Sequence, residues 1–353
     1  MEKILLSGNE AAAEGAIRAG CRFYAGYPIT PQNELIGYMA KRMPEAGGVF
    51  LQSESEIAAI NMVFGASVTG NRAMTSSSSP GISLKQEGIS YLAACELPAV
   101  IVNVMRGGPG LGNIAPAQAD YFQATKGGGH GGYHIIVLAP SSVLEMFELT
   151  YWAFDLADTY RTPVMILADG MLGQMMEPLR INRKIKKSFP KKPWALTGCK
   201  GRKPNNIKSL FLETEQLERL NTILQKKYLC IKQREVKCET RYIHDSKIIV
   251  VAYGTVGRIC KTVVSRLRTQ GFKVGLIRPI TLWPFPSGVL KRVSVRAQCI
   301  YVVEMSAGQM VEDVRLSVEG RCPVKFFGKT GGEIPSEREI ITRIKKVFKG
   351  GRK

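Results

Sequence analysis

Short hydrophobic runs alternate with longer segments of mixed polarity through the first half of the chain. Runs such as PAVIVNV and PVMILA are typical of strands buried on both faces of a parallel sheet. The segments between them place apolar residues at helical spacing, and the connections are short. This alternation predicts a parallel α/β sheet over residues 1–180. The expected helices cover residues 9–19, 31–43, 55–68, 82–95, 117–126 and 141–158, and the expected strands lie in CRFYAGYP, VFLQS, RAMTSS, PAVIVNV, HIIVLA and PVMILA.

The alternation stops after residue 180 and resumes near residue 247. Between them lie KKPWALTGCKGRKPNN and one charged helical segment, LETEQLERLNTILQKKYLCIKQREVK. The later strands are expected in KIIVVAYGT, KVGLIRP, CIYVVEM and PVKFFGK, with helices over 256–270 and 309–319 and a turn at WPFPSG. The pattern therefore predicts a larger α/β domain over residues 1–185, a basic linker with one helix over 186–245, a smaller α/β domain over 246–345 and a basic tail over 346–353.

Size and composition agree with two globular domains. The chain has 353 residues, of which 45% are hydrophobic and 22% charged. No apolar run approaches the roughly 20 residues of a membrane span, so we expect a cytoplasmic protein. The cysteines are scattered, without the two-residue spacing typical of metal or cluster loops, so we expect reduced structural thiols and no iron–sulfur cluster on this chain. They are Cys21, Cys95, Cys199, Cys230, Cys238, Cys260, Cys299 and Cys322.

The net charge of +20 first suggests a nucleic-acid partner. Its distribution argues against one, because residues 180–247 hold nineteen Lys and Arg against six Asp and Glu. This segment has no nucleic-acid motif, and its few aromatic residues are not interleaved for base stacking. A basic face for an acidic protein partner fits better. A non-catalytic nucleic-acid-associated protein stays as an alternative, and salt-dependent retention of RNA would reveal it.

The glycine-rich stretch MRGGPGLGN, residues 105–113, follows an apolar strand pattern. A dinucleotide fingerprint needs G-x-G-x-x-G leading straight into a helix, whereas here Gly108, Gly110 and Gly112 are followed by Asn-Ile-Ala-Pro. This disfavours a phosphate cradle and a nicotinamide dehydrogenase. It leaves Arg106 at the carboxyl end of a strand, where open α/β sheets bind ligands. Arg106 is either a ligand-binding group or a structural arginine paired at the surface.

The stretch YPITPQNEL places Thr30 between two prolines at a strand-to-helix junction. Its hydroxyl can cap the following helix or face a ligand.

The stretch LQSESEIAAINMVFGAS places two carboxylates, Glu54 and Glu56, at the start of a helix. The helix dipole favours carboxylates there, so both are compatible with simple first-turn stabilisation. The helix behind them is rich in small residues and is expected to pack closely, which would also suit an acid held against a cofactor. The local sequence leaves both interpretations open.

Two further motifs do not indicate a functional site. GGGHGGYH holds two histidines but no nearby cysteine or acid, so we expect no metal site there. Ala168-Asp169-Gly170 lacks the Gly-Asp-Gly opening and the distant Asn of a magnesium–diphosphate motif, so Asp169 is interpreted as strand-end structure.

Three long phrases together identify a family. GYPITPQNE, SESEIAAINMVFGAS and SSSSPGISLKQEGISYLAACELPAVIVNVMRGGPGLGN closely resemble the α subunit of the thiamine-diphosphate-dependent 2-oxoacid:ferredoxin oxidoreductases. KPWALTG, VAYGTVGRICKTVV, GLIRPITLWPFP and VVEMSAGQMVEDVRL extend the likeness over nearly the whole chain. The sequence is most similar to subunits that act on branched-chain 2-oxoacids such as 3-methyl-2-oxobutanoate (ketoisovalerate), and next to those that act on 2-oxoglutarate.

The resemblance implies a thiamine pyrimidine-binding domain over 1–185 and a transketolase-C-terminal-like domain over 246–345. In such domains a glutamate nine positions before a glycine contacts N1′ of the aminopyrimidine, and Glu56 stands nine before Gly65. This selects Glu56 over Glu54. The family also places an arginine and a threonine at the substrate carboxylate, and Arg106 and Thr30 are the matching residues. Pro28 is expected to line the cofactor site with them.

The resemblance further implies that other chains complete the enzyme. A β subunit would hold magnesium and the diphosphate half of thiamine diphosphate, and cluster-bearing subunits would pass electrons to ferredoxin. The expected reaction converts a 2-oxoacid and coenzyme A to acyl-CoA and CO2. The isolated chain is therefore expected to be inactive. Two departures from the family pattern, Ala119 and Gly132, touch none of the predicted site residues.

Overall fold

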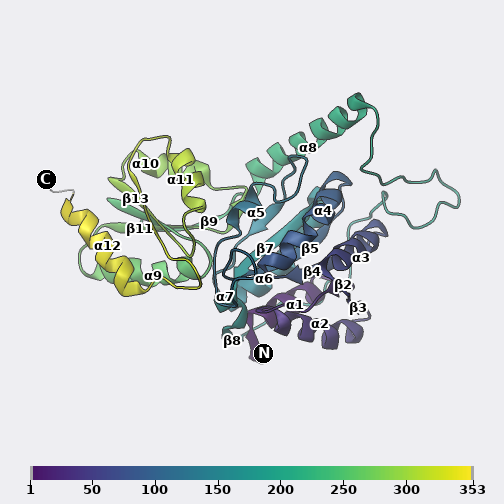
Figure 1. Cartoon of the computed structure of the whole chain (residues 1–353), viewed down its shortest axis with the longest axis horizontal. Coiled ribbons are helices and arrows are strands. Elements are labelled where there is room, and N and C mark those ends of the chain that lie inside the picture. The colour runs from purple at the N-terminus through teal and green to yellow at the C-terminus, as the bar shows by residue number, and fades with distance from the viewer. Residues whose placement is uncertain (1–2, 351–353) are drawn as a thin grey trace.

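The computed structural model describes residues 3–350, which form two large sheets covered by helices and one small two-stranded sheet. Figure 1 shows the N-terminal part in purple and blue beside the C-terminal part in green and yellow. Helix α8 (Thr214–Arg234) projects along one side of the molecule. The prediction of an α/β fold with mainly parallel strands is confirmed.

The first sheet has seven strands in the order β12-β6-β7-β5-β4-β2-β3. All neighbouring pairs are parallel except β12 with β6. Every residue of β5 and β7 is buried, which is why these strands appear in the sequence as unbroken apolar runs. The strands are β2 (Phe23–Gly26), β3 (Val49–Gln52), β4 (Ala73–Ser77), β5 (Ala99–Met105), β6 (Ile136–Leu138), β7 (Pro163–Asp169) and β12 (Thr281–Trp283).

Helices cover both faces of this sheet, and α1, α3, α6 and α7 begin at side-chain caps. Ser7 and Glu10 form a capping box at the start of α1, and Ser142 caps α6 by accepting a hydrogen bond from the Glu145 amide. Helix α5 is shorter than the expected 117–126, because Pro116 bridges to Arg106 and Gln118 binds the second part of the chain. The helices are α1 (Gly8–Arg18), α2 (Asn33–Glu45), α3 (Glu56–Val68), α4 (Ser79–Ala94), α5 (Tyr121–Thr125), α6 (Val143–Tyr160) and α7 (Gly170–Gln174).

The second sheet has five strands in the order β14-β13-β10-β11-β9. Strand β10 is buried throughout and pairs in parallel with β11 and β13. The strands are β9 (Cys238–Arg241), β10 (Ile248–Val251), β11 (Val274–Pro279), β13 (Cys299–Glu304) and β14 (Val324–Gly328), and the helices are α9 (Gly254–Thr269), α10 (Ser287–Ser294), α11 (Met310–Val318) and α12 (Glu337–Gly350).

Several strands differ from the sequence-based expectation. Strand β9 lies within the expected linker but pairs antiparallel with β11, and β12 ends at the first residue of the expected WPFPSG turn and joins the first sheet. Strands β1 (Ile4–Ser7) and β8 (Met176–Leu179) form a small antiparallel ladder that the sequence did not indicate. All four strands are only three or four residues long, too short to show a clear pattern.

The two parts of the chain are joined by a buried arginine. Arg278 on β11 is 1% exposed and donates to both carboxylate oxygens of Glu145 on α6, at 3.0 and 2.7 Å, and to Glu239 on β9 at 2.8 Å. We expect Arg278→Met to lower the free energy of unfolding by ~3–5 kcal/mol, because it leaves two carboxylates without their buried partner. Denaturant unfolding measures the change. Arg241→Met removes an exposed partner of the same Glu239 and is expected to cost less than about 1 kcal/mol; equal losses for both variants would contradict this interpretation.

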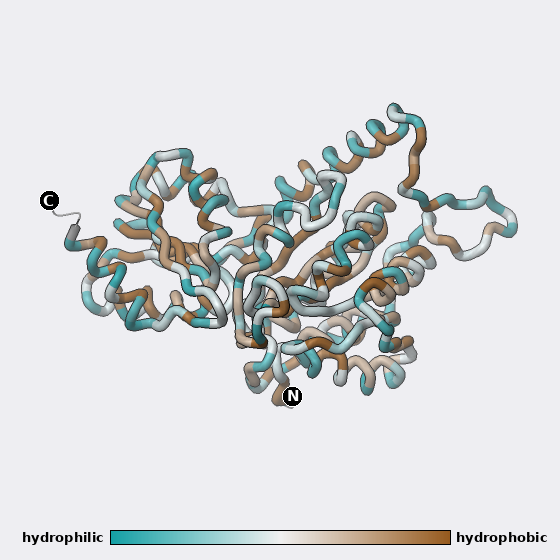
Figure 2. The backbone as a smooth tube through the Cα atoms, in the orientation of Figure 1, coloured by the Kyte–Doolittle hydropathy of each residue, from teal (hydrophilic) through white to brown (hydrophobic). Residues whose placement is uncertain are grey.

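The basic linker lies against the first part of the chain. Lys186 and Lys192 pair with Asp155 and Asp158 on α6, each at 2.6 Å. Helix α8 buries Leu224, Tyr228 and Ile231. In the projecting part of this helix, hydrophilic and hydrophobic residues alternate (Figure 2). Part of the positive charge of this segment is therefore neutralised within the chain.

Candidate active site

Glu56 is the first residue of α3 and lies next to the start of α4. Strand β3 ends at Gln52, and Ser55 caps α3 by accepting a hydrogen bond from the Ala58 amide. The Glu56 side chain is 5% exposed, with one oxygen 3.5 Å from Ser77 Oγ at the end of β4. Gly81 packs so closely that an added Cβ would lie 2.4 Å from a Glu56 carboxylate oxygen. The fold therefore holds this carboxylate at the carboxyl edge of the sheet, as expected, whereas Glu54 is exposed.

A buried lysine that no sequence motif indicates lies beside Glu56. Lys85 on α4 is 0% exposed, and its Nζ donates to Thr75 Oγ1 at 3.0 Å and to the Glu56 backbone oxygen at 3.4 Å. Burial lowers the pKa of Lys85 to about 7, against a smaller opposing effect of the Glu56 charge. In the sequence Lys85 is a single charge in a helix pattern, so only its position in the fold reveals it.

Arg106 directly follows β5 and is 6% exposed. Its guanidinium donates to the backbone oxygens of Thr30 and Leu111, each at 3.0 Å. Its Nε is buried without a hydrogen-bond partner within residues 3–350. Because Arg106 is buried, it is not paired at the surface, although its two backbone contacts are structural. The residue holds two loops together and keeps donor groups that these contacts do not use.

Thr30 and Pro28 lie on the exposed loop between β2 and α2. The N-cap residue of α2 is Gln32 and makes no side-chain cap bond, so the interpretation of Thr30 as the helix cap is wrong. The Thr30 backbone oxygen binds Arg106, which brings these two predicted residues together.

Residues 77–79 connect the Glu56 and Arg106 sites. Ser77 contacts the Glu56 carboxylate, and Ser79 Oγ accepts a hydrogen bond from the Arg106 amide at 3.0 Å. Ser79 also donates to Asp120, whose pKa is raised by burial despite the hydrogen bonds it accepts. The structure therefore places the predicted residues at one edge of the sheet, where β2, β3, β4 and β5 end.

The glycine loop adopts a conformation that needs glycine at two positions. Gly110 and Gly112 have φ of +67° and +57°, and a Cβ on Gly112 would lie 1.7 Å from the Gly107 oxygen. The next helix, α5, begins only at Tyr121, as expected for a loop that is not a phosphate cradle.

Asp169 is structural, as predicted. It ends β7, accepts hydrogen bonds from the amides of Met171 and Leu172, and accepts the Thr255 hydroxyl from the second part of the chain. These contacts use the carboxylate as a helix cap and as a link between the two parts.

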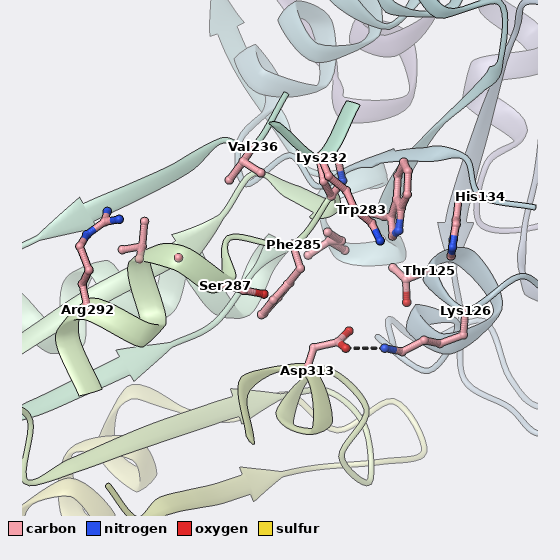
Figure 3. Close-up of a pocket in the computed structure, with 14 residues that line it drawn as sticks. Thr125, Lys126, His134, Lys232, Val236, Trp283, Phe285, Ser287, Arg292 and Asp313 are labelled. Atoms are coloured by element: carbon pink, nitrogen blue, oxygen red, sulfur yellow. Dashed lines mark hydrogen bonds and ion pairs between the residues drawn. The ribbon is translucent and has the colours of Figure 1, made fainter. Parts of the chain in front are cut away.

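A large cavity lies elsewhere, between the two parts of the chain. It has a volume of about 700 Å³ and is lined by groups that include Lys232, Trp283 and Phe285, with Lys126 paired to Asp313 at its side (Figure 3). None of the four predicted site residues lines it. Cavity size alone therefore does not identify the site.

No three His, Cys, Asp or Glu side chains in residues 3–350 gather so as to hold a metal ion. In the same range, no helix is both long and apolar enough to cross a membrane.

The chain matches two family descriptions. Residues 14–222 match "Pyruvate flavodoxin/ferredoxin oxidoreductase, thiamine diP-bdg", and residues 246–340 match "Pyruvate:ferredoxin oxidoreductase core domain II". The matches place thiamine diphosphate binding in the N-terminal part, where the predicted site residues lie.

Named relatives extend over the same length. The ketoisovalerate oxidoreductase subunit VorB of Methanothermobacter marburgensis is 49% identical, with 97% of each chain covered. The 2-oxoglutarate synthase subunit KorA of Archaeoglobus fulgidus is 42% identical over 93% of this chain and 95% of its own. These identities extend through both α/β parts and the linker.

Solved structures share the fold. A 2-oxoglutarate:ferredoxin oxidoreductase from Magnetococcus marinus, with 2-oxoglutarate, coenzyme A and succinyl-CoA bound, superposes with a TM-score of 0.89 at 26% identity. The match covers 98% of this chain and 65% of that one. A split-gene transketolase matches in fold alone, at a TM-score of 0.61 and 13% identity. The chain belongs to the thiamine-diphosphate-binding pyruvate flavodoxin/ferredoxin oxidoreductase family, which confirms the resemblance seen in its sequence.

Proposed function

We propose that this chain is the α subunit of a 2-oxoacid:ferredoxin oxidoreductase that acts on 3-methyl-2-oxobutanoate. The observation that carries the substrate is the 49% identity to two ketoisovalerate oxidoreductase subunits, over 97% of each chain. Identity to the 2-oxoglutarate synthase subunits is lower, 37–42%. The reaction is the oxidative decarboxylation of the 2-oxoacid with coenzyme A, with electrons passed to ferredoxin in the cytoplasm.

The site residues fit the aminopyrimidine of thiamine diphosphate. The Glu56 carboxylate is buried, yet within residues 3–350 its one hydrogen bond is the long contact to Ser77. A buried carboxylate with so few partners is costly unless a ligand donates to it. A ring nitrogen that shares a proton with Glu56 would supply that partner, and Gly81 leaves room for the carboxylate where any side chain would displace it.

Each proposed residue has a defined task. Thiamine diphosphate, when bound, supplies the nucleophilic carbon that attacks the 2-oxo group. Glu56 holds a proton at its carboxylate oxygen, facing N1′ of the ring. Arg106 binds the substrate carboxylate with the donors that its contacts to Thr30 and Leu111 leave free, and so orients the 2-oxo group. Thr30 and Pro28 line the same side, and the glycine loop limits access of water.

Partner chains complete this site in the proposal. A β subunit holds magnesium and the diphosphate of the cofactor, and other subunits carry the iron–sulfur clusters. Support comes from the relatives, which are named as subunits, and from the absence of Gly-Asp-Gly and of closely spaced cysteines in the sequence. The exposed Thr30–Pro28 loop is where a second chain would close the site.

The proposal is tested by co-expressing the chain with its genomic neighbours. We expect coenzyme-A-dependent reduction of a dye, fastest with 3-methyl-2-oxobutanoate, slower with 2-oxoglutarate and pyruvate, and none by the separately purified chain. A preference for 2-oxoglutarate would replace the substrate assignment. Turnover by the isolated chain with thiamine diphosphate would overturn the shared site.

A further inference from the structure

Lys85 is buried without a carboxylate at ion-pair distance in the described part of the chain. It is 0% exposed, and its Nζ contacts only the Thr75 hydroxyl and the backbone oxygen of Glu56. Buried positions of a helix are normally occupied by apolar residues. Burying a charged amine without a paired carboxylate costs stability. Such a position therefore calls for a functional explanation.

Lys85 lies on the same face of α4 as Gly81, one helical turn further on. Gly81 packs against the Glu56 carboxylate, and Lys85 contacts the Glu56 backbone. Both positions on α4 therefore face Glu56, and Lys85 does so from the core side. Because Lys85 is fully buried, it does not reach solvent and acts on the site through the residues that it contacts, of which Glu56 is the predicted site residue.

No other charged group near Lys85 in the described part of the chain pairs with its positive charge. Glu87 on α4 is exposed and binds Tyr91, Asp169 at the end of β7 is bound to helix amides and Thr255, and Arg106 at the end of β5 is a cation. Helix α3 and strand β4 contribute no other charged side chain. Within residues 3–350, Glu56 is the one charge found to act on Lys85.

We propose that Lys85 is a positioning residue: its buried ammonium, held against the Glu56 backbone, fixes the start of α3 and stabilises the negative charge that the Glu56 carboxylate carries once its proton has passed to the cofactor ring. The proposal rests on the proposed role of Glu56. A buried positive charge stabilises a nearby carboxylate, and a stabilisation of ~1.4 kcal/mol in the transition state corresponds to a tenfold effect on turnover. Lys85 titrates at about pH 7, so its effect is present below that pH and declines above it.

The test compares Lys85→Met with Lys85→Gln in the assembled complex. Methionine matches the volume, and glutamine keeps a hydrogen bond to Thr75, but neither has the charge. At pH 6.5 we expect both variants to lose turnover about tenfold or more. We also expect both to lose the decline in activity that the wild type shows as the pH rises through 7.

Thermal unfolding without cofactor gives a readout that does not depend on activity. In the wild type the unfolded lysine is protonated up to about pH 10, whereas the folded one is protonated only below about 7. The cost of burying it is therefore full below pH 7 and disappears towards pH 10. Lys85→Met is expected to raise the midpoint of unfolding by several degrees at pH 6.5, and by less at pH 9.

Three results would overturn the proposal: wild-type turnover in Lys85→Met, rescue by Lys85→Gln, or a loss of turnover that parallels a lowered midpoint of unfolding. Thr75→Val is the matched control, because it removes the hydrogen bond of Lys85 but keeps its charge, and is expected to retain the pH dependence. Failure of the proposed function is recognised separately, since Glu56→Gln would then remain active whatever the Lys85 variants do.

Discussion

Glu56→Gln is expected to reduce turnover by about 10²–10⁴-fold, the usual range for loss of a general acid or base. Glutamine keeps the size of the side chain at the close contact with Gly81 but cannot hold an ionisable proton towards the cofactor ring. Dye reduction with coenzyme A and 3-methyl-2-oxobutanoate by the assembled complex measures the loss. The folded structure should be retained, because a carboxylate in a first helical turn contributes only ~0.3–1 kcal/mol.

Glu54→Gln is the matched control for this experiment. Glu54 lies two residues earlier on the same connection but is exposed. Its substitution is expected to leave turnover within about twofold of wild type, as for a surface change. Near-normal activity in Glu56→Gln, or equal losses in the two variants, would refute the assignment of Glu56.

Arg106→Met is expected to lower kcat/KM for the 2-oxoacid by about 10²-fold or more. Removing one member of a buried charge pair costs ~2–5 kcal/mol, here the pair between the guanidinium and the substrate carboxylate. The change should appear in KM as well as kcat, because the contact is made before and during the reaction. Steady-state kinetics over a range of 2-oxoacid concentrations give both values.

The structural contacts of Arg106 need their own control. The guanidinium also holds the Thr30 and Leu111 backbone oxygens, so the thermal midpoint of the variant should be measured together with the kinetics. Arg106→Lys keeps the charge but not the fork of donors, and we expect it to recover only part of kcat/KM. Guanidinium added to Arg106→Met is expected to restore part of the activity. If it restores none, and the variant differs only in a lowered thermal midpoint, Arg106 holds the two loops together and does not bind the substrate.

The sequence predicted the positions of helices and strands better than it predicted which strands pair with one another. Long buried strands such as β5 and β7 and amphipathic or capped helices such as α6 carry local signals, and these elements lie where expected. Strands β9 and β12 were missed because their identity depends on pairing with residues far away in the chain. Local pattern does not encode such pairing.

The same distinction between local sequence signals and long-range packing applies to the site residues. The nine-residue spacing to Gly65 selects Glu56 through the family resemblance, and the strand pattern places Arg106 at a strand end. Lys85 could not be found this way, because its burial results from the packing of α4 on α3 and β4. The local sequence allowed the Thr30 hydroxyl either to cap α2 or to face a ligand. The structure excludes the cap, because the N-cap residue is Gln32.

The place of β12 in the first sheet has a consequence for synthesis on the ribosome. Strand β6 is complete at Leu138, but its outer neighbour ends at Trp283, 145 positions later. At roughly 5–20 residues per second, β6 presents an unpaired edge for about 7–30 s in each nascent chain. An uncovered strand edge favours pairing between molecules. The interval in which chaperones would have to protect this protein is therefore set by one three-residue strand.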